Sequence, residues 1–258
     1  MCFLYLQRTL YFKVNKFYYL NSKHFIMIKY WKNIGINPQE GLFVLVLTIL
    51  VLFNFSLTAL RVYYSQELYF LFLVWNLFLA LLPWVGAKVA QHLHQKEWSR
   101  GMVFLCLGLT IVFLPNAPYL LTDLYHLRWT HSYNLMWLDI LMLVAYAATG
   151  LVGFYATLFV LEQLLEAYWG KIWTAVFLVF LFFLNGFGVY LGRFLRFNSW
   201  NILTEPWILF EAIVERFLNP VAHPRTWGLT FGYGVFFLLG FYGLKLWKYS
   251  LLKFQNMD

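Results

Sequence analysis

Six long and mostly apolar stretches restrict this sequence to one class of fold. A bilayer core of about 30 Å is crossed by about 20 residues of α-helix, and each stretch is long enough to cross it. The stretches are Gly41–Leu60, Leu68–Ala87, Met102–Leu121, Leu135–Leu161, Ile172–Gly192 and Gly228–Leu246. The pattern therefore predicts an all-α, polytopic membrane bundle with six transmembrane helices.

The composition supports the bilayer as the solvent of this chain. Of its 258 residues 62% are hydrophobic and only 12% are charged, whereas a soluble domain has about 25% charged residues. The net charge of +8 fits basic loops that contact lipid headgroups, so we expect the bilayer rather than nucleic acid as the partner.

The distribution of basic residues predicts the orientation. With the N-terminus in the cytoplasm, thirteen of the nineteen Lys and Arg residues, including every lysine, fall in inside segments. The positive-inside rule then gives six spans with both termini cytoplasmic. Eleven of the twelve tryptophans lie near the ends of the expected spans, where indole rings prefer to sit.

The expected organisation is one domain with two short flanking segments. Residues 1–40 form a basic cytoplasmic extension, 41–247 the six-helix domain and 248–258 a short cytoplasmic tail. Either Met27 is the true start and residues 1–26 are translated upstream sequence, or residues 1–26 are a native tail at the membrane surface.

The last outer loop contains a predicted helix over Glu205–Leu218. Thr204 is placed to cap it, Pro206 suits its first turn and Asn219-Pro220 ends it. One apolar stripe along this segment predicts an interfacial helix on the outer leaflet. It either packs on the bundle as a passive lid or takes part in function.

The third stretch is the most informative for function. Met102–Leu114 has only 13 residues, so the crossing must include Pro115-Asn116-Ala117-Pro118. Proline removes a backbone donor and clashes with the preceding turn, which predicts a kink or break in the outer half of the membrane. Such a break usually faces protein or a wet cavity, because freed carbonyls need partners.

Beyond this break, Asn116, Tyr119, Asp123 and His126 are spaced 3, 4 and 3 apart, which predicts one polar helical face. A carboxylate and an imidazole in a lined cavity can act as catalytic or orienting groups, so Asp123 and His126 are the catalytic candidates. The alternative is a structural helix end in which Asp123 pairs with an arginine.

The end of the fifth stretch supplies candidate partners. Gly188 and Gly192 would let another backbone approach closely. Two arginines at the boundary can clamp a phosphate or carboxylate, or close ion pairs with Asp123, Asp139 or Glu205. The binding candidates are Asn116, Tyr119, Asn185, Arg193 and Arg196.

Metal and nucleophile chemistry have little support. Asp123, His126 and His131, with Glu205 or His223, match no closed zinc motif. No G-x-S-x-G motif is present. We predict no metal site, and the sequence indicates no particular cofactor.

Two long motifs resemble a known family. FLPNAPYLLTDLYHL (113–127) and GFGVYLGRFLRFNSWN (186–201) are similar to a bacterial integral membrane family catalogued as domain of unknown function 1361. The resemblance extends over roughly Gly41–Trp247. It implies a multi-pass protein of the bacterial cytoplasmic (inner) membrane and carries no established activity.

The sequence is compatible with three functions. The first is a membrane-embedded enzyme or binding protein with an outward-facing site for an anionic group, such as a lipid or lipid-linked phosphate. The second is a small transporter or channel, and the third is a structural or assembly subunit of a membrane complex without catalytic activity. The sequence does not indicate an oligomeric state.

Overall fold

The computed structural model describes residues 38–129 and 133–255. The chain divides into two compact units, residues 1–53 and 54–258. The described part of the first unit is the beginning of one helix, α2 (Pro38–Ser65), and the rest of α2 belongs to the second unit. The prediction about Met27 lies outside the described residues, and everything below concerns the second unit.

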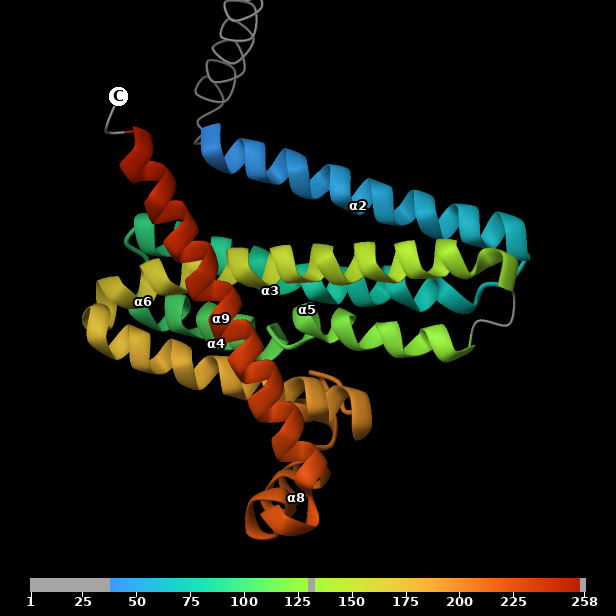
Figure 1. Cartoon of the computed structure of the whole chain (residues 1–258). Coiled ribbons are helices and arrows are strands. Elements are labelled where there is room, and N and C mark those ends of the chain that lie inside the picture. The colour runs from blue at the N-terminus through green and yellow to red at the C-terminus, as the bar shows by residue number, and fades with distance from the viewer. Residues whose placement is uncertain (1–37, 130–132, 256–258) are drawn as a thin grey trace, which may run out of the picture. The chain divides into compact units, whose positions relative to one another are not determined.

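The described residues contain helices and no strand, so the all-α prediction is confirmed. Figure 1 follows the chain through them. After α2 come η1 (Tyr69–Leu71), α3 (Phe72–Gln95), α4 (Arg100–Phe113), α5 (Asn116–Tyr119), η2 (Leu120–Trp129), η3 (Tyr133–Leu135), α6 (Met136–Phe194), α7 (Asn201–Thr204), α8 (Pro206–Leu218), η4 (Pro220–Ala222) and α9 (Pro224–Gln255).

Five helical segments of the described chain are long and apolar enough to cross a membrane, which indicates a multi-pass membrane protein. One of them, α6, has 59 residues, or roughly 90 Å at the rise of an α-helix. That is about three times the thickness of a bilayer core. At Gly170 the backbone leaves the helix, with φ 76° and ψ 170°, and the chain turns back there (Figure 1). The predicted fourth and fifth stretches lie on either side of this turn, while six crossings and cytoplasmic termini stay predictions.

The predicted break in the third stretch is confirmed. Helix α4 ends at Phe113, and α5 and the 3₁₀ helix η2 follow after Pro115. Pro115 and Pro118 each lack the N–H that would continue the α-helical ladder. Two glycines of α6 accept the irregular segment. A Cβ on Gly188 would lie 2.6 Å from the Pro115 ring, and one on Gly192 would lie 3.2 Å from the Tyr119 ring.

The second half of α6 packs on α9 through another close backbone contact. A Cβ on Gly186 would lie 2.5 Å from the carbonyl oxygen of Thr230 in α9. The end of α2 is joined to the first half of α6 by polar contacts. Arg61 Nε donates to Asp139 Oδ1 at 2.5 Å, and both side chains are buried. The hydroxyls of Thr58 and Tyr146 are hydrogen-bonded at 2.8 Å.

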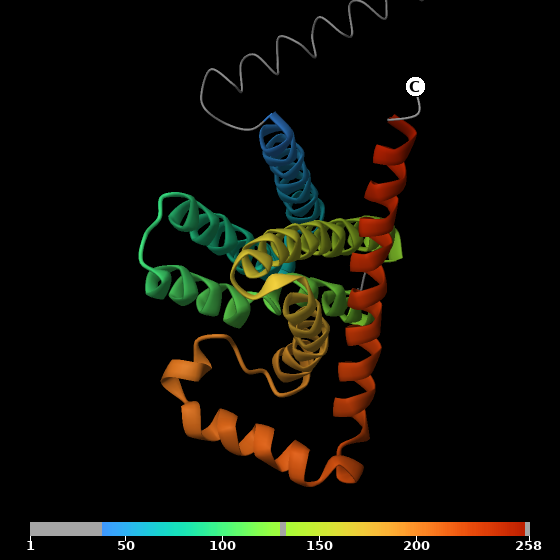
Figure 2. The same cartoon turned by 90° about the vertical axis from the view of Figure 1, so that its left-hand side faces the viewer.

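The predicted helix of the last outer loop is present as α8, between α6 and α9 (Figure 2). It ends before Asn219-Pro220, as expected. The predicted cap is wrong: the N-cap is Glu205 without a side-chain bond. Thr204 ends α7, and its hydroxyl donates to the carbonyl of Trp200. The position of α8 at a membrane interface stays a prediction. Helix α9 continues to Gln255, past the expected end of the last span.

Candidate functional site

A buried carboxylate is the centre of the candidate site. Asp123 of η2 is 1% exposed and accepts from two other helices. Asn76 Nδ2 of α3 donates to Oδ2 at 3.0 Å, and Arg193 Nη1 at the end of α6 donates to Oδ1 at 3.3 Å. A buried carboxylate needs such partners, because its charge has lost its hydration. The expected pairing of Asp123 with an arginine is therefore present, and that arginine is Arg193. The purely structural role that this alternative assigned to Asp123 stays a prediction.

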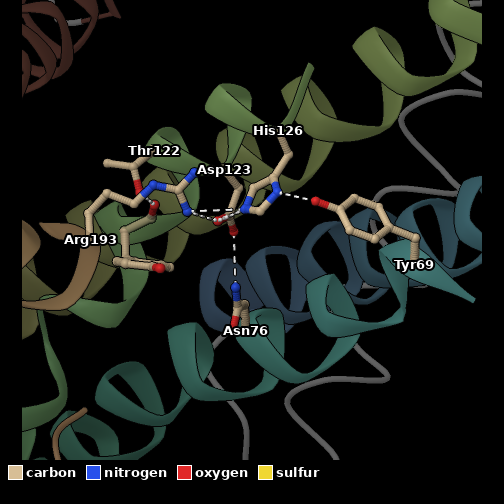
Figure 3. Close-up of polar contacts among 7 residues, drawn as sticks. Tyr69, Asn76, Thr122, Asp123, His126 and Arg193 are labelled. Atoms are coloured by element: carbon tan, nitrogen blue, oxygen red, sulfur yellow. Dashed lines mark hydrogen bonds and ion pairs between the residues drawn. The ribbon is translucent and has the colours of Figure 1, made fainter. Parts of the chain in front are cut away.

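An imidazole lies on the other side of the same arginine. His126 Nε2 is 3.2 Å from Arg193 Nη1, and its Nδ1 is 2.8 Å from the hydroxyl of Tyr69 in η1. Figure 3 shows the resulting chain of side chains from Asn76 through Asp123, Arg193 and His126 to Tyr69. We call these five residues the polar cluster.

The 3₁₀ geometry of η2 explains why two of its residues join the polar cluster. A 3₁₀ helix has three residues per turn, so side chains three apart lie above one another. Asp123 and His126 therefore share one face of η2. The ten-residue length of this 3₁₀ segment is unusual. The segment begins at Leu120, two residues after Pro118 of the proline break.

The same change of helical period separates the four residues predicted to share one face. Tyr119 does not hydrogen-bond to the polar cluster, but its ring centre lies 5.9 Å from the Arg193 guanidinium. Asn116 Nδ2 instead donates to the Phe113 carbonyl at 2.9 Å and to Ser199 Oγ at 3.0 Å. Asn116 therefore ties the break to the chain beyond α6 and takes no part in the polar cluster.

The two remaining binding candidates lie apart from Asp123. Asn185 is buried and donates to the Leu181 carbonyl of its own helix. Helix α6 ends at Phe194, so Arg196 does not continue the helical face of Asn185 and Gly192. Its backbone has φ 60°, and its side chain is exposed. It has no hydrogen bond or ion pair with the described residues.

A cavity of about 610 Å³ adjoins the polar cluster. Its walls are mostly aliphatic and aromatic, from α4, α5, the second half of α6, α8 and α9. Six neutral polar residues also line it: Asn76, Asn116, Tyr119, Asn198, Ser199 and Thr230. Because Asn76 also donates to Asp123, the cavity and the polar cluster share a wall.

Arg193 uses only part of its guanidinium within the protein. Nη1 serves both Asp123 and His126, while no described residue accepts from Nε or Nη2. The guanidinium lies 5.1 Å from the centre of the Tyr125 ring, a favourable cation–π distance. The side chain is 13% exposed. The unused donors can therefore meet a ligand oxygen without breaking the existing pair.

Sequence reasoning missed Asn76 and Tyr69, although a signal for Asn76 exists. It is the only amide or charged residue in the predicted stretch Leu68–Ala87, and a lone polar side chain in an apolar span usually has a partner. The Arg61–Asp139 pair was also missed. Asp139, expected as a possible partner of Arg193 or Arg196, pairs with Arg61.

Within the described chain, no three His, Cys, Asp or Glu side chains gather closely enough to hold a metal ion. His223 and Glu215 form one ion pair, with Nε2 and Oε1 3.4 Å apart. His131 lies outside the described residues. The chemistry available at the site is therefore that of hydrogen-bond donors, one buried carboxylate and one imidazole.

Comparisons with known proteins identify a family and no activity. No curated protein and no solved structure matches the chain. A family profile matches residues 75–239, a range that includes both sequence motifs, the cavity walls and all of the polar cluster except Tyr69. The chain therefore belongs to the family described as "Protein of unknown function (DUF1361)".

Proposed function

We propose that this protein binds an anionic amphiphile of the membrane, such as a lipid or a lipid-linked phosphate. The observation that carries the proposal is the shared wall between the cavity and the polar cluster, formed by Asn76. An apolar chain would occupy the cavity, and the anionic head group would lie against Arg193. We propose that the site faces outward from a bacterial cytoplasmic membrane, as the distribution of lysines suggests.

The apolar lining of the cavity argues that a lipid chain occupies it. The cavity is partly open to its surroundings, and aliphatic and aromatic side chains form most of its lining. Water is a poor filling for a mostly apolar cavity, because it needs several polar partners. A lipid chain from the bilayer satisfies the aromatic and aliphatic walls.

The donors near the cavity argue for an anionic head. The polar residues that line the cavity are neutral, and the charged residue that follows the lining residue Gly192 is Arg193, which has unused donors. A guanidinium binds phosphate and carboxylate through several parallel hydrogen bonds. We propose Arg196 as a second cation, since its side chain is exposed and has no ion pair with any described residue.

The cavity is tested by filling it from one wall. Ile213 of α8 lines the cavity, whereas Ile208 of the same helix is exposed and does not. Ile213→Trp and the matched control Ile208→Trp are purified from membranes in mild detergent, and retained lipids are quantified by mass spectrometry. We expect wild type and Ile208→Trp to retain the same anionic lipid and Ile213→Trp to lose it. Equal lipid content in all three would overturn the proposal.

The head group is tested with Arg193→Met, with the exposed Arg225→Met as control. We expect Arg193→Met to lose selectivity for phosphatidylglycerol over phosphatidylcholine, while Arg225→Met keeps it. Adding inorganic phosphate separates two sources of the anion. If free phosphate binds equally well to wild type and Ile213→Trp, the ligand is a free anion and the cavity has no part in its recognition.

A structural or assembly role is the second candidate. The observation that favours it is the pairing of Asp123 with two helices at once, since such pairs often only hold helices together. On this view, substitutions in the polar cluster reduce stability and leave lipid retention per folded molecule unchanged. The two candidates therefore differ in the lipid content of a variant that remains folded.

A further inference from the structure

We infer that Tyr69, and not His126, donates a hydrogen bond to a ligand at the η1 end of the polar cluster. Arg193 fixes the tautomer of His126, and that tautomer leaves the Tyr69 proton available to the ligand. The inference rests on the proposed function for the identity of the ligand. Its structural half concerns one proton on His126, and it can be decided without any ligand.

The first step is the direction of the hydrogen bond between Arg193 and His126. Arginine has donors and no acceptor. At 3.2 Å from Arg193 Nη1, Nε2 of His126 must therefore be the unprotonated, accepting nitrogen. The competing arrangement, a protonated Nε2 directed at Asp123, has a distance of 4.0 Å to Oδ1, which is too long for a hydrogen bond.

The second step concerns the proton on Nδ1 of His126. A neutral imidazole with an accepting Nε2 carries its proton on Nδ1. At 2.8 Å, Nδ1–H donates to the hydroxyl oxygen of Tyr69. Both nitrogens of His126 are then used inside the protein. His126 cannot act as a base toward a ligand without giving up one of these bonds, so it is a positioning residue.

The third step concerns the proton of Tyr69. Its oxygen accepts from His126, and its own O–H is not taken up by any described residue. The side chain is 48% exposed. Its ring is fixed by contacts with Phe70 and Phe72, with centroids 5.0 and 6.0 Å away. A hydroxyl that is bonded to His126, on a ring held by Phe70 and Phe72, presents an ordered donor.

The polar cluster thus offers donors at two places, from Arg193 in its middle and from Tyr69 at one end. A matching ligand presents acceptor oxygens, as a phosphate or carboxylate does, and lacks an ammonium group at that point. Loss of the Tyr69 hydroxyl should weaken binding of the anionic head roughly tenfold, which is the lower end of the range for a hydrogen bond to a charged partner.

The tautomer is tested by nitrogen NMR of protein labelled with ¹⁵N-histidine in phosphatidylcholine nanodiscs. The chain has six histidines, and a His126→Gln sample identifies the signal of interest. We expect His126 to be neutral with the proton on Nδ1 at pH 7.5, in wild type and in Tyr69→Phe alike. Arg193→Met should move the proton to Nε2. A proton on Nε2 in wild type, or the same tautomer in Arg193→Met, would overturn the inference.

The role of the hydroxyl is tested by adding phosphatidylglycerol to the same nanodiscs. Tyr69→Phe should bind roughly tenfold more weakly than wild type, while Tyr63→Phe, which changes another exposed tyrosine, should bind as wild type does. Unchanged binding in Tyr69→Phe would refute the contact with the ligand. If wild type binds no anionic lipid, the proposed function and the ligand contact both fail, and the NMR result still decides the tautomer.

Discussion

The strongest test of the polar cluster is a double-variant cycle on Asp123 and Arg193. Asp123→Asn removes the charge and keeps the shape, so Arg193 loses its counter-ion. Breaking a buried pair from one side costs about 3–5 kcal/mol. Arg193 is 13% exposed and can reach polar surroundings, whereas Asp123 is 1% exposed. We therefore expect about 3 kcal/mol for Asp123→Asn and about 5 kcal/mol for Arg193→Met.

The double variant Asp123→Asn/Arg193→Met contains neither charge and should return to within about 1 kcal/mol of wild type. Unfolding is followed by tryptophan fluorescence during titration with dodecyl sulfate in mixed micelles. If the double variant is as unstable as the sum of the two single variants, the pair is not coupled and our reading of the site is wrong. The refolded double variant should also fail to retain anionic lipid, which separates loss of binding from loss of structure.

Three further predictions use the same unfolding assay. Arg196→Gly should stabilise the protein by about 1 kcal/mol, because the φ of 60° at this residue disfavours a side chain. The same variant should retain less anionic lipid. Lower stability of Arg196→Gly would show that the arginine side chain holds the turn. Gly186→Ala should cost about 1–3 kcal/mol, since its Cβ would lie 2.5 Å from the Thr230 carbonyl oxygen. By contrast, Gly243→Ala, where nothing lies within 4 Å, should gain about 0.5–1 kcal/mol. Arg61→Met should cost about 3–5 kcal/mol because it breaks the buried ion pair between Arg61 and Asp139, and Arg225→Met should cost less than about 0.5 kcal/mol.

The features predicted correctly from the sequence are those set by local chemistry. The apolar stretches follow from the thickness of the bilayer, and the end of α4 follows from the missing donors of Pro115 and Pro118. The absence of a Cβ at Gly188 and Gly192 allows a close approach, although the rings of Pro115 and Tyr119 make it and not the expected backbone. Each of these needs only the residue and its neighbours in the chain.

The features that were missed depend on geometry that a repeating pattern cannot supply. The spacing of Asn116, Tyr119, Asp123 and His126 was read with 3.6 residues per turn, but η2 has the 3₁₀ period. Asn116 consequently left the polar cluster. Arg196 was placed on the face of α6, but the helix ends two residues before it. Asn76 and Tyr69 join Asp123 and His126 from α3 and η1. The lone amide of Asn76 indicates that it has a partner, but nothing local to it shows that this partner is Asp123.

The pairing of Asp123 does not by itself decide between a structural and a binding role, because the two roles use different atoms. Its carboxylate is occupied by Asn76 and Arg193, which is what a structural role requires. Arg193 Nη1 donates to both Asp123 and His126, whereas Nε and Nη2 donate to none of the described residues. A purely structural pair gains most when its donors are all satisfied. Arg193 directly follows Gly192, which lines the mostly apolar cavity, so its unused donors favour a site that is completed by an amphiphile.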